Sequence, residues 1–444
     1  MGALRAFFVG GALAAAVLPA AAENLVQVYR DAQRYDATYA AARFTLDAGR
    51  ERLPQARALL LPALNLTGSA TQTRLDVRSR EETAFASFVR SPQSGVVTLQ
   101  LSQPVFRPQN SIQVDQAEYQ VRQAEATFGQ AGQDLAVRTA QAYFDVLAAE
   151  DTLMLVGAQK AAISEQLAQA KRNFEVGTAT ITDTHEAQSR YDLIVAQEIA
   201  AQNDVANKRQ SLQLITGKEY PRLAPLRPDV KLPPPNPSTM QTWVEMAEKQ
   251  SYTVQIQDAV AETAQLEMRR ASSGHKPTLD VVATYGQTAE SATATTTFGR
   301  DTTTQSIGLQ LALPLYQGGS VNSREREAAA NYNKARDDLQ AARRTAALNA
   351  RQSYVSVVNG IAQVGALEQA LVSSQSALDS NRLGYEVGVR INIDVLNAQQ
   401  QLFSARRDLA VARYNTITNH LKLKAAAGSL RDEDLEEVNR VLAR

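Results

Sequence analysis

Residues 174–188 read FEVGTATITDTHEAQ, and residues 385–399 read YEVGVRINIDVLNAQ. The two segments share Glu-Val-Gly, an aspartate six residues after the glycine, and Ala-Gln at their ends. Each lies in a long region without proline, where a glycine permits a tight turn between helices. We interpret the segments as the tips of two helical hairpins in a duplicated chain, and we expect its function to be located there.

The overall composition excludes several classes of function. The 444 residues carry 46 basic and 46 acidic side chains, so no global positive field favours nucleic acid as a partner. The absence of cysteine excludes disulfides, thiolate metal sites and an N-terminal anchor of the lipoprotein kind. His185, His275 and His420 are scattered, and the sequence has no nucleophile elbow, P-loop or metal-ligand spacing. We therefore expect no enzyme, cofactor or metal.

The N-terminus has the pattern of a secretory signal peptide over residues 1–22. Arg5 supplies a positive charge, residues 7–18 form an apolar stretch, and residues 20–22 are a run of alanines suited to cleavage. A short membrane anchor is the alternative, but the apolar run is short for a span of about 20 residues. The mature chain is expected to begin at Glu23, outside the cytoplasm.

Proline placement divides the mature chain into two halves. None of the 15 prolines lies between Gln109 and Tyr220 or after Pro314, which leaves room for very long helices. Seven prolines fall within residues 221–237, and this segment is predicted to be an extended linker.

The two halves match each other at a nearly constant offset. Tyr143 and Tyr354, like Gly177 and Gly388, are 211 residues apart. This spacing indicates an internal duplication of about 200 residues rather than a short solenoid repeat. The predicted organisation is a first repeat over residues 23–220, a second repeat over 238–430 and an acidic tail over 431–444.

Each half contains two stretches in which apolar residues alternate with small polar ones. They cover residues 64–71 and 97–102 in the first half, and 279–285 and 306–313 in the second. Strands of about 9–11 residues with one apolar and one polar face suit a transmembrane barrel with a wet lumen. An ordinary soluble sheet is the alternative, but the flanking helices offer no obvious layer to cover it.

The helical regions carry a coiled-coil repeat. Over residues 135–174, mostly apolar or small residues recur at alternating spacings of four and three, and residues 346–385 repeat the pattern. A helix over residues 109–174 would be roughly 100 Å long. The opening helix is predicted over residues 24–60.

Four strands cannot close a barrel, and an open edge in lipid leaves backbone groups without hydrogen-bond partners. The smallest outer-membrane barrels have about eight strands, so several copies must pool theirs, two giving eight and three giving twelve. The predicted fold is therefore an α+β membrane protein with four transmembrane strands per chain and a long coiled-coil helical extension. Such an assembly would be a conduit through the outer membrane.

These residues resemble the TolC family of outer-membrane efflux and secretion channels over essentially the whole mature chain. The matching segments are residues 173–177, 179–183, 212–217, 384–388, 393–396, 412–415 and 427–430, with the acidic residues 432–437. The resemblance implies a homotrimer with a twelve-stranded barrel in outer-membrane lipid and an α-helical periplasmic tunnel. It also implies docking to an inner-membrane transporter, of RND or ABC type, through a periplasmic adaptor.

The resemblance further implies a gate at the periplasmic end of the tunnel, where inward-coiled helices are held by polar links. Thr182 and Asp183 match the acceptors of these links, and Tyr385 and Arg390 match the donors. Contacts of arginine or tyrosine with carboxylate are suitable latches. A few such links, each worth about 1 kcal/mol, can be overcome by adaptor binding. Arg172 replaces the family's usual uncharged amide, so the local network is expected to differ.

The same comparison implies that Asp394 faces the lumen at the constriction, where three copies would form a carboxylate ring that favours cations. The family often has a second aspartate one turn further on, but this chain has Asn397. We therefore expect one acidic ring rather than two, and weaker block by multivalent cations. Helix capping after the turn is the alternative role for Asp183 and Asp394, and the two roles are compatible.

The exposed tips are implied to receive the helical hairpin of the adaptor. The residues concerned are Val176, Gly177 and Thr178 in the first copy and Val387, Gly388 and Val389 in the second. A purely structural turn is the alternative for each of them. The alternative for the whole chain is a periplasmic coiled-coil adaptor, which would need a compact β domain within one hairpin rather than strand pairs in both halves.

Overall fold

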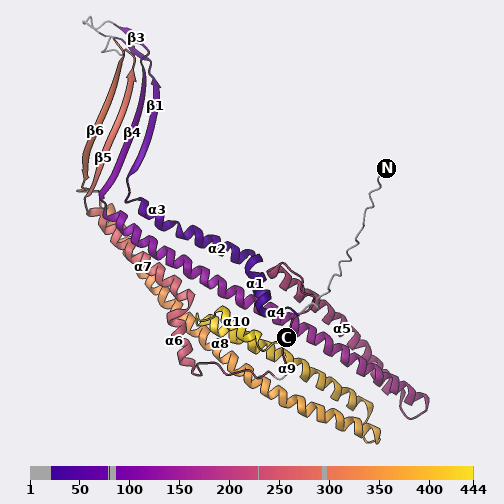
Figure 1. Ribbon diagram of the computed structural model, residues 1–444. Coiled ribbons are helices and arrows are strands. Elements are labelled where there is room, and N and C mark those ends of the chain that lie inside the picture. Colours follow the sequence, from indigo (N-terminus) through magenta and orange to yellow (C-terminus); the bar gives the residue numbers. More distant parts are fainter. Residues whose placement is uncertain (1–21, 79, 81–86, 229, 293–297, 444) are drawn as a thin grey trace, which may run out of the picture.

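The computed structural model describes residues 22–78, 80, 87–228, 230–292 and 298–443, which form one elongated molecule (Figure 1). A curved sheet makes up one end, and long helices continue from its base to the other end. The predicted signal peptide lies outside the described residues except for Ala22. The predicted fold class, strands at one end and a coiled-coil extension at the other, is confirmed.

The four long strands form one antiparallel sheet in the order β1-β4-β5-β6. Their bounds are Ala63–Gln72 for β1, Gln93–Phe106 for β4, Thr278–Glu290 for β5 and Arg300–Ala312 for β6. All four cover regions that the alternation predicted to be strands, and the two halves of the chain meet where β4 pairs with β5. A short hairpin between β1 and β4, which the sequence did not predict, consists of β2 (Leu75–Val77) and β3 (Phe88–Arg90).

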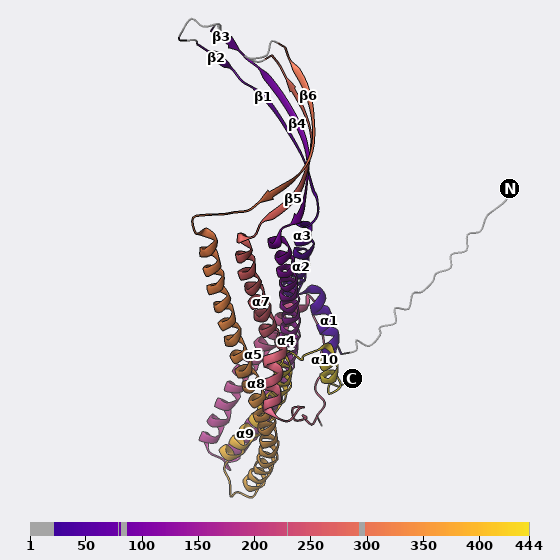
Figure 2. The same cartoon turned by 90° about the vertical axis from the view of Figure 1, so that its left-hand side faces the viewer.

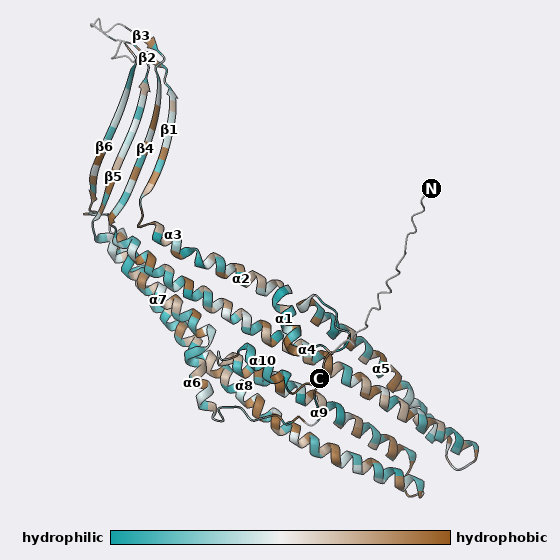
Figure 3. Cartoon of the chain, viewed as in Figure 1, coloured by the Kyte–Doolittle hydropathy of each residue, from teal (hydrophilic) through white to brown (hydrophobic). Residues whose placement is uncertain are grey.

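The register gathers apolar residues from all four strands on one face of the sheet. Leu64 lies opposite Leu101, Leu101 opposite Ala283, and Ala283 opposite Ile307. The adjacent row, on the other face, consists of Asn65, Gln100, Thr284 and Ser306. Ile307 is 80% exposed, and none of the described helices covers the sheet in either view (Figures 1 and 2). Hydrophobic and hydrophilic residues are interspersed along the strands (Figure 3). One face suits lipid and the other an aqueous lumen.

Two helical hairpins extend away from the sheet. Helix α4 (Pro108–Glu175) turns back as α5 (Ile181–Thr216), and α8 (Ser320–Glu386) turns back as α9 (Asn392–Ala426). Pro108 suits the first turn of α4, where its missing N–H has no intrahelical acceptor to lose. Both tips lie at the end of the molecule opposite the sheet (Figure 1). The hairpins predicted from the doubled segment are therefore confirmed.

Several of the predicted coiled-coil positions are buried. Leu135, Val146 and Leu167 of α4 are buried, and so are Val357 and Leu378 of α8. Small residues such as Ala170 and Ala350 are also buried in these helices, which allows the backbones to approach closely. The seam thus explains how helices with so few aromatic residues pack.

The opening segment was predicted as one helix but consists of three: α1 (Leu25–Tyr35), α2 (Ala37–Arg50) and α3 (Arg52–Ala58). Asp36 makes the first break, because its extended backbone ends α1 while its carboxylate accepts a hydrogen bond of 2.7 Å from the backbone N–H of Tyr39 in α2. No proline or glycine marks this position, so the break was missed.

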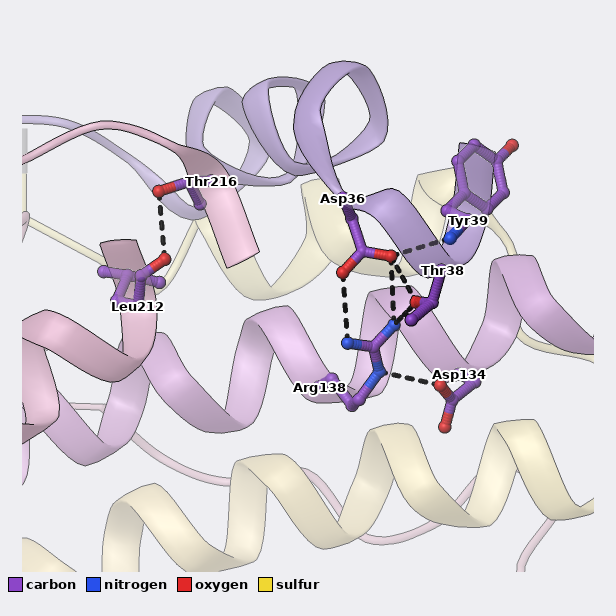
Figure 4. A network of polar contacts seen from close by, with 7 residues as sticks. All are labelled: Asp36, Thr38, Tyr39, Asp134, Arg138, Leu212 and Thr216. Atoms are coloured by element: carbon purple, nitrogen blue, oxygen red, sulfur yellow. Dashed lines mark hydrogen bonds and ion pairs between the residues drawn. The ribbon is translucent and has the colours of Figure 1, made fainter. Parts of the chain in front are cut away.

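A polar network holds the α1–α2 break against α4 (Figure 4). Arg138 donates from Nη1 to Asp36 at 3.2 Å, from Nη2 to the Thr38 hydroxyl at 2.9 Å, and from Nε to Asp134 at 2.7 Å. Burial raises the pKa of the Asp36 carboxyl, but hydrogen bonds from Thr38, Arg138 and the Tyr39 backbone outweigh it, so the net pKa is lowered. The ionised carboxylate is therefore the form that the fold stabilises.

The middle of the molecule brings together the residues just before α1, the linker and the end of the described chain after α10. Glu23 forms a parallel bridge with Leu223, and Leu226 forms an antiparallel bridge with Leu442. The hydroxyl of buried Tyr143 donates to the backbone oxygen of Ala224 at 2.8 Å. The remaining helical elements are α6 (Met240–Gln250), α7 (Tyr252–Ser272), the 3₁₀ turn η1 (Ser273–His275) and α10 (Asp432–Asn439). The described residues of the proline-rich segment 221–237 contain no helix and no long strand, and its role as a linker between two repeats stays a prediction.

Candidate functional site at the hairpin tips

The turn at each tip contains a glycine whose backbone lies in the left-handed region. Gly177 has φ of 78° and Gly388 has φ of 80°. The turns close in the same way: the backbone N–H of Thr178 donates to Asn173 at 2.8 Å, and that of Val389 donates to Gly384 at 2.9 Å. A side chain at either glycine would strain the backbone, which accounts for the shared Glu-Val-Gly.

The tips expose apolar side chains. Val176 is 72% exposed, Val387 64% and Val389 79%. Thr178 and both turn glycines are exposed as well. The residues predicted to receive an adaptor therefore form the accessible end of the molecule, although their role stays a prediction.

Asp183 completes a capping box at the start of α5. Its carboxylate accepts hydrogen bonds from the backbone N–H and the hydroxyl of Thr180, at 3.0 and 2.8 Å. The backbone N–H of Asp183 in turn donates to the Thr180 hydroxyl oxygen at 3.3 Å. The alternative capping role is therefore present at Asp183, while neighbouring Thr182 is exposed.

The predicted donors lie at the second tip but have other partners within one chain. The hydroxyl of Tyr385 accepts from the side-chain amide of Asn173 at 3.1 Å. Nη1 of Arg390 lies 3.7 Å from the carboxylate of Asp394, four residues further along the same segment. In the described part of a single chain, neither donor is hydrogen-bonded to Thr182 or Asp183, so the latch stays a prediction. Arg172 is exposed, and its backbone oxygen accepts from Val176 at 3.1 Å.

Further contacts join the two hairpins of one chain, and the sequence did not predict them. The side-chain amide of Gln166 donates to Asn392, and Arg190 of α5 donates to Asn397 and Gln400 of α9. Beside them, Leu396 of α9 enters the core of the first hairpin, where it is 3% exposed. Asn392, Leu396 and Asn397 lie within the second copy of the duplicated segment, but their partners on the first hairpin are not marked by the repeat.

A second polar centre lies higher in the helices, away from the tips. The hydroxyl of Tyr414 in α9 donates to the carboxylate of Asp151 in α4 at 2.7 Å, and the Tyr414 ring stacks on Phe144. Burial raises the pKa of Asp151, and the hydrogen bond from Tyr414 offsets this only in part. Among the described residues, no group of three histidine or acidic side chains is placed to hold a metal ion.

Comparisons with known proteins agree on a single class. A family model described as outer membrane efflux protein matches residues 28–218 and 243–429, on either side of the linker. The chain is 34% identical to outer membrane protein TolC of Vibrio cholerae, with 98% of each chain covered. It is 31% identical to proteases secretion protein PrtF of Dickeya chrysanthemi, with 94% of this chain and 91% of PrtF covered. Its fold matches the crystal structure of VceC from Vibrio cholerae with a TM-score of 0.76 at 21% identity, covering 91% and 96% of the two chains.

Proposed function

The chain belongs to the outer membrane efflux protein family, and on this premise we propose that three copies assemble into a duct gated at the hairpin tips. The protein is an outer-membrane channel of the class that serves efflux or type I secretion. Its relatives are channel and secretion proteins, and the chain is proposed, like them, to have no enzymatic activity of its own.

The open sheet is the observation that carries the proposed assembly. Among the described strands, β1 and β6 each pair on one side only, so a single chain in lipid would leave two rows of backbone groups unsatisfied. Joining β6 of one copy to β1 of the next satisfies both rows. Three copies would close a barrel of twelve strands, within the range of about 8 to 26 found in the outer membrane.

The helices support the same assembly. Leu348, Val355 and Val372 of α8 are 51%, 46% and 60% exposed in the single chain. Helix α8 also contains an 18-residue window with a mean hydropathy of 1.3, of which 11% is buried, so by length and composition it could cross a membrane. Because α8 lies along the coiled coil, we propose that helices of a neighbouring copy, and not lipid, contact its exposed apolar side chains.

The proposed gate depends most on Arg390. In the described chain its guanidinium is close to Asp394, and the proposed latch would bring it and Tyr385 to Thr182 and Asp183. The guanidinium of Arg390 would then contact both the ring carboxylate of Asp394 and the latch acceptors Thr182 and Asp183. Gly384 leaves space for this side chain, because a Cβ there would lie 2.7 Å from Cγ of Arg390.

The proposed partners are a periplasmic adaptor and, through it, an inner-membrane transporter of RND or ABC type. The exposed valines support this proposal, because apolar side chains at the accessible ends of both helical hairpins offer a surface for another hairpin. Adaptor binding there would shift the gate toward its open form, because the adaptor would bind the open form more tightly than the closed form.

Two measurements on the purified protein test the proposal. We expect a heat-resistant trimer on gels and discrete conductance steps in planar bilayers. Replacement of Asp394 by alanine is expected to reduce the cation preference, measured as the reversal potential in a salt gradient. A monomer without conductance would refute the duct, and an unchanged reversal potential would refute the carboxylate ring alone.

A further inference from the structure

A guanidinium fork ties the two hairpins of one chain together above the tips. Nη1 of Arg190 in α5 donates to Oε1 of Gln400 in α9 at 2.6 Å, and Nη2 donates to Oδ1 of Asn397 at 2.9 Å. The two acceptors are three residues apart on α9, so they lie on the same helix face. The planar guanidinium presents two separate N–H donors in a fixed geometry that suits this pair of acceptors.

The fork lies beside the apolar contact between the same hairpins. Leu396, which precedes Asn397, is buried with Ile194, which lies four residues after Arg190 on α5. The rest of this cluster comes from the first hairpin and consists of Ile163, Leu167, Ala170 and Ala187. An apolar side chain and a polar fork therefore hold α9 against α5 at one level.

The charge of Arg190 is not neutralised by its partners. Both acceptors are neutral amides, and among the described residues no carboxylate forms an ion pair with its guanidinium. Arg190 is also half-buried. A carboxylate at position 397 would therefore meet an available cation at hydrogen-bond distance.

We propose that Arg190 is a positioning residue of the gate, one that ties α5 to α9 and turns the side chain of residue 397 toward the first hairpin. The inference rests on the proposed gate. It has two consequences: loosening the fork favours the open form, and a carboxylate at 397 pairs with Arg190 instead of adding a second charged ring at the constriction.

The first consequence is tested by conductance in planar bilayers. Arg190→Gln removes the charged donor, and the ratio of open to closed channels is expected to rise roughly three- to tenfold, as for loss of one or two charged hydrogen bonds near the surface. Gln400→Ala removes one acceptor and should cause a smaller rise. It also keeps the test valid if Arg190→Gln does not assemble into trimers.

The second consequence is tested by ion selectivity, which a merely structural contact would not change. Asn397→Asp alone should leave the reversal potential in a salt gradient as in the wild type, because Arg190 neutralises the new carboxylate. The same substitution made in the Arg190→Gln background should shift the reversal potential toward cation preference. An equal shift in both backgrounds would overturn the proposal.

A matched control separates the fork from ion pairs within a hairpin. Lys160 donates to Glu198 at 2.6 Å, but both residues belong to the first hairpin, so Lys160→Gln should leave the open-to-closed ratio unchanged. If Lys160→Gln and Arg190→Gln raise the ratio equally, the fork has no special role. If the wild-type protein forms no channel, the proposed function itself fails; a conducting wild type with an unaffected Arg190→Gln variant refutes only the fork.

Discussion

Arg107 and Asp280 join the sheet to the helices through two parallel hydrogen bonds. Nε and Nη2 of Arg107, the residue before α4, donate to the two carboxylate oxygens of Asp280 in β5 at 2.8 and 2.6 Å. The Asp280 side chain is 8% exposed. The bond therefore links the first half of the chain to the second at the base of the sheet, where strand becomes helix.

Arg107→Gln is expected to weaken this joint by about 1–3 kcal/mol, because a buried carboxylate loses its charged donors. The measurement is the temperature at which the proposed trimer dissociates on gels. Asp280→Asn combined with Arg107→Gln should recover part of the loss, since no buried charge is then left without a partner. A double variant that is less stable than Arg107→Gln alone would contradict this account.

The two faces of the sheet should respond differently to charge. Ile307→Arg places a cation on the apolar face and is expected to cost about 2–4 kcal/mol near the middle of the bilayer. Ser306→Arg, one residue away on the polar face, is the matched control and should be tolerated. The yield of the proposed trimer extracted from outer membranes reports the difference, and equal yields would show that the faces are assigned wrongly.

The turn glycines should tolerate alanine poorly. Gly177→Ala and Gly388→Ala force a side chain into the left-handed region, at a cost of about 1 kcal/mol each. Gly157→Ala and Gly365→Ala are controls, because these glycines lie within α4 and α8 with open space where the Cβ would be, and there alanine favours the helix. Thermal unfolding followed by circular dichroism should separate the two pairs.

The Asp151–Tyr414 pair predicts a dependence of stability on pH. The pKa of Asp151 in the folded state is raised above its ordinary value of 3.8. At pH values between the ordinary pKa and the raised pKa, the folded state therefore binds more protons than the unfolded state. Stability contributed by this group therefore falls as pH rises through that window. Asp151→Asn keeps an acceptor for Tyr414 without the charge, so near neutral pH we expect it to match or exceed the wild type in thermal stability.

The wild type should also gain stability on mild acidification relative to Asp151→Asn, as measured by thermal unfolding at a series of pH values. A constant difference between the two proteins across that series would show that Asp151 does not titrate in the window. The effect of Asp36 on stability has the opposite sign. Its pKa is lowered in the folded state, so the stability that it contributes is lost as pH falls through that lowered pKa.

The elements that could be predicted from the sequence are those marked by a hydrophobic periodicity or by the internal duplication. Alternation located the strands around Leu64 and Ile307, and the repeat of Gly177 at Gly388 located both hairpins. The break at Asp36 was missed because a single capping aspartate resembles any polar residue on a helix surface. Short-range patterns thus sufficed for elements but not for their interruptions.

The contacts between hairpins could not be predicted for a different physical reason. Arg190 meets Asn397 across 207 residues of chain, and the geometry depends on how two coiled coils lie against each other. Asp183 differs, because its cap at the start of α5 is a local contact that the sequence offered as an alternative role, while its role as a latch acceptor stays a prediction. Side-chain partners across helices follow from packing, which a linear pattern does not contain.

The unpaired edges of β1 and β6 have a genetic consequence. In the proposed trimer every chain supplies one third of a closed wall, so a single faulty edge opens the whole ring. If half of the chains in a cell carried such a fault and mixed freely, only about one trimer in eight would be free of it. Edge mutations should therefore be dominant over a wild-type copy, whereas a chain that never folds should be recessive.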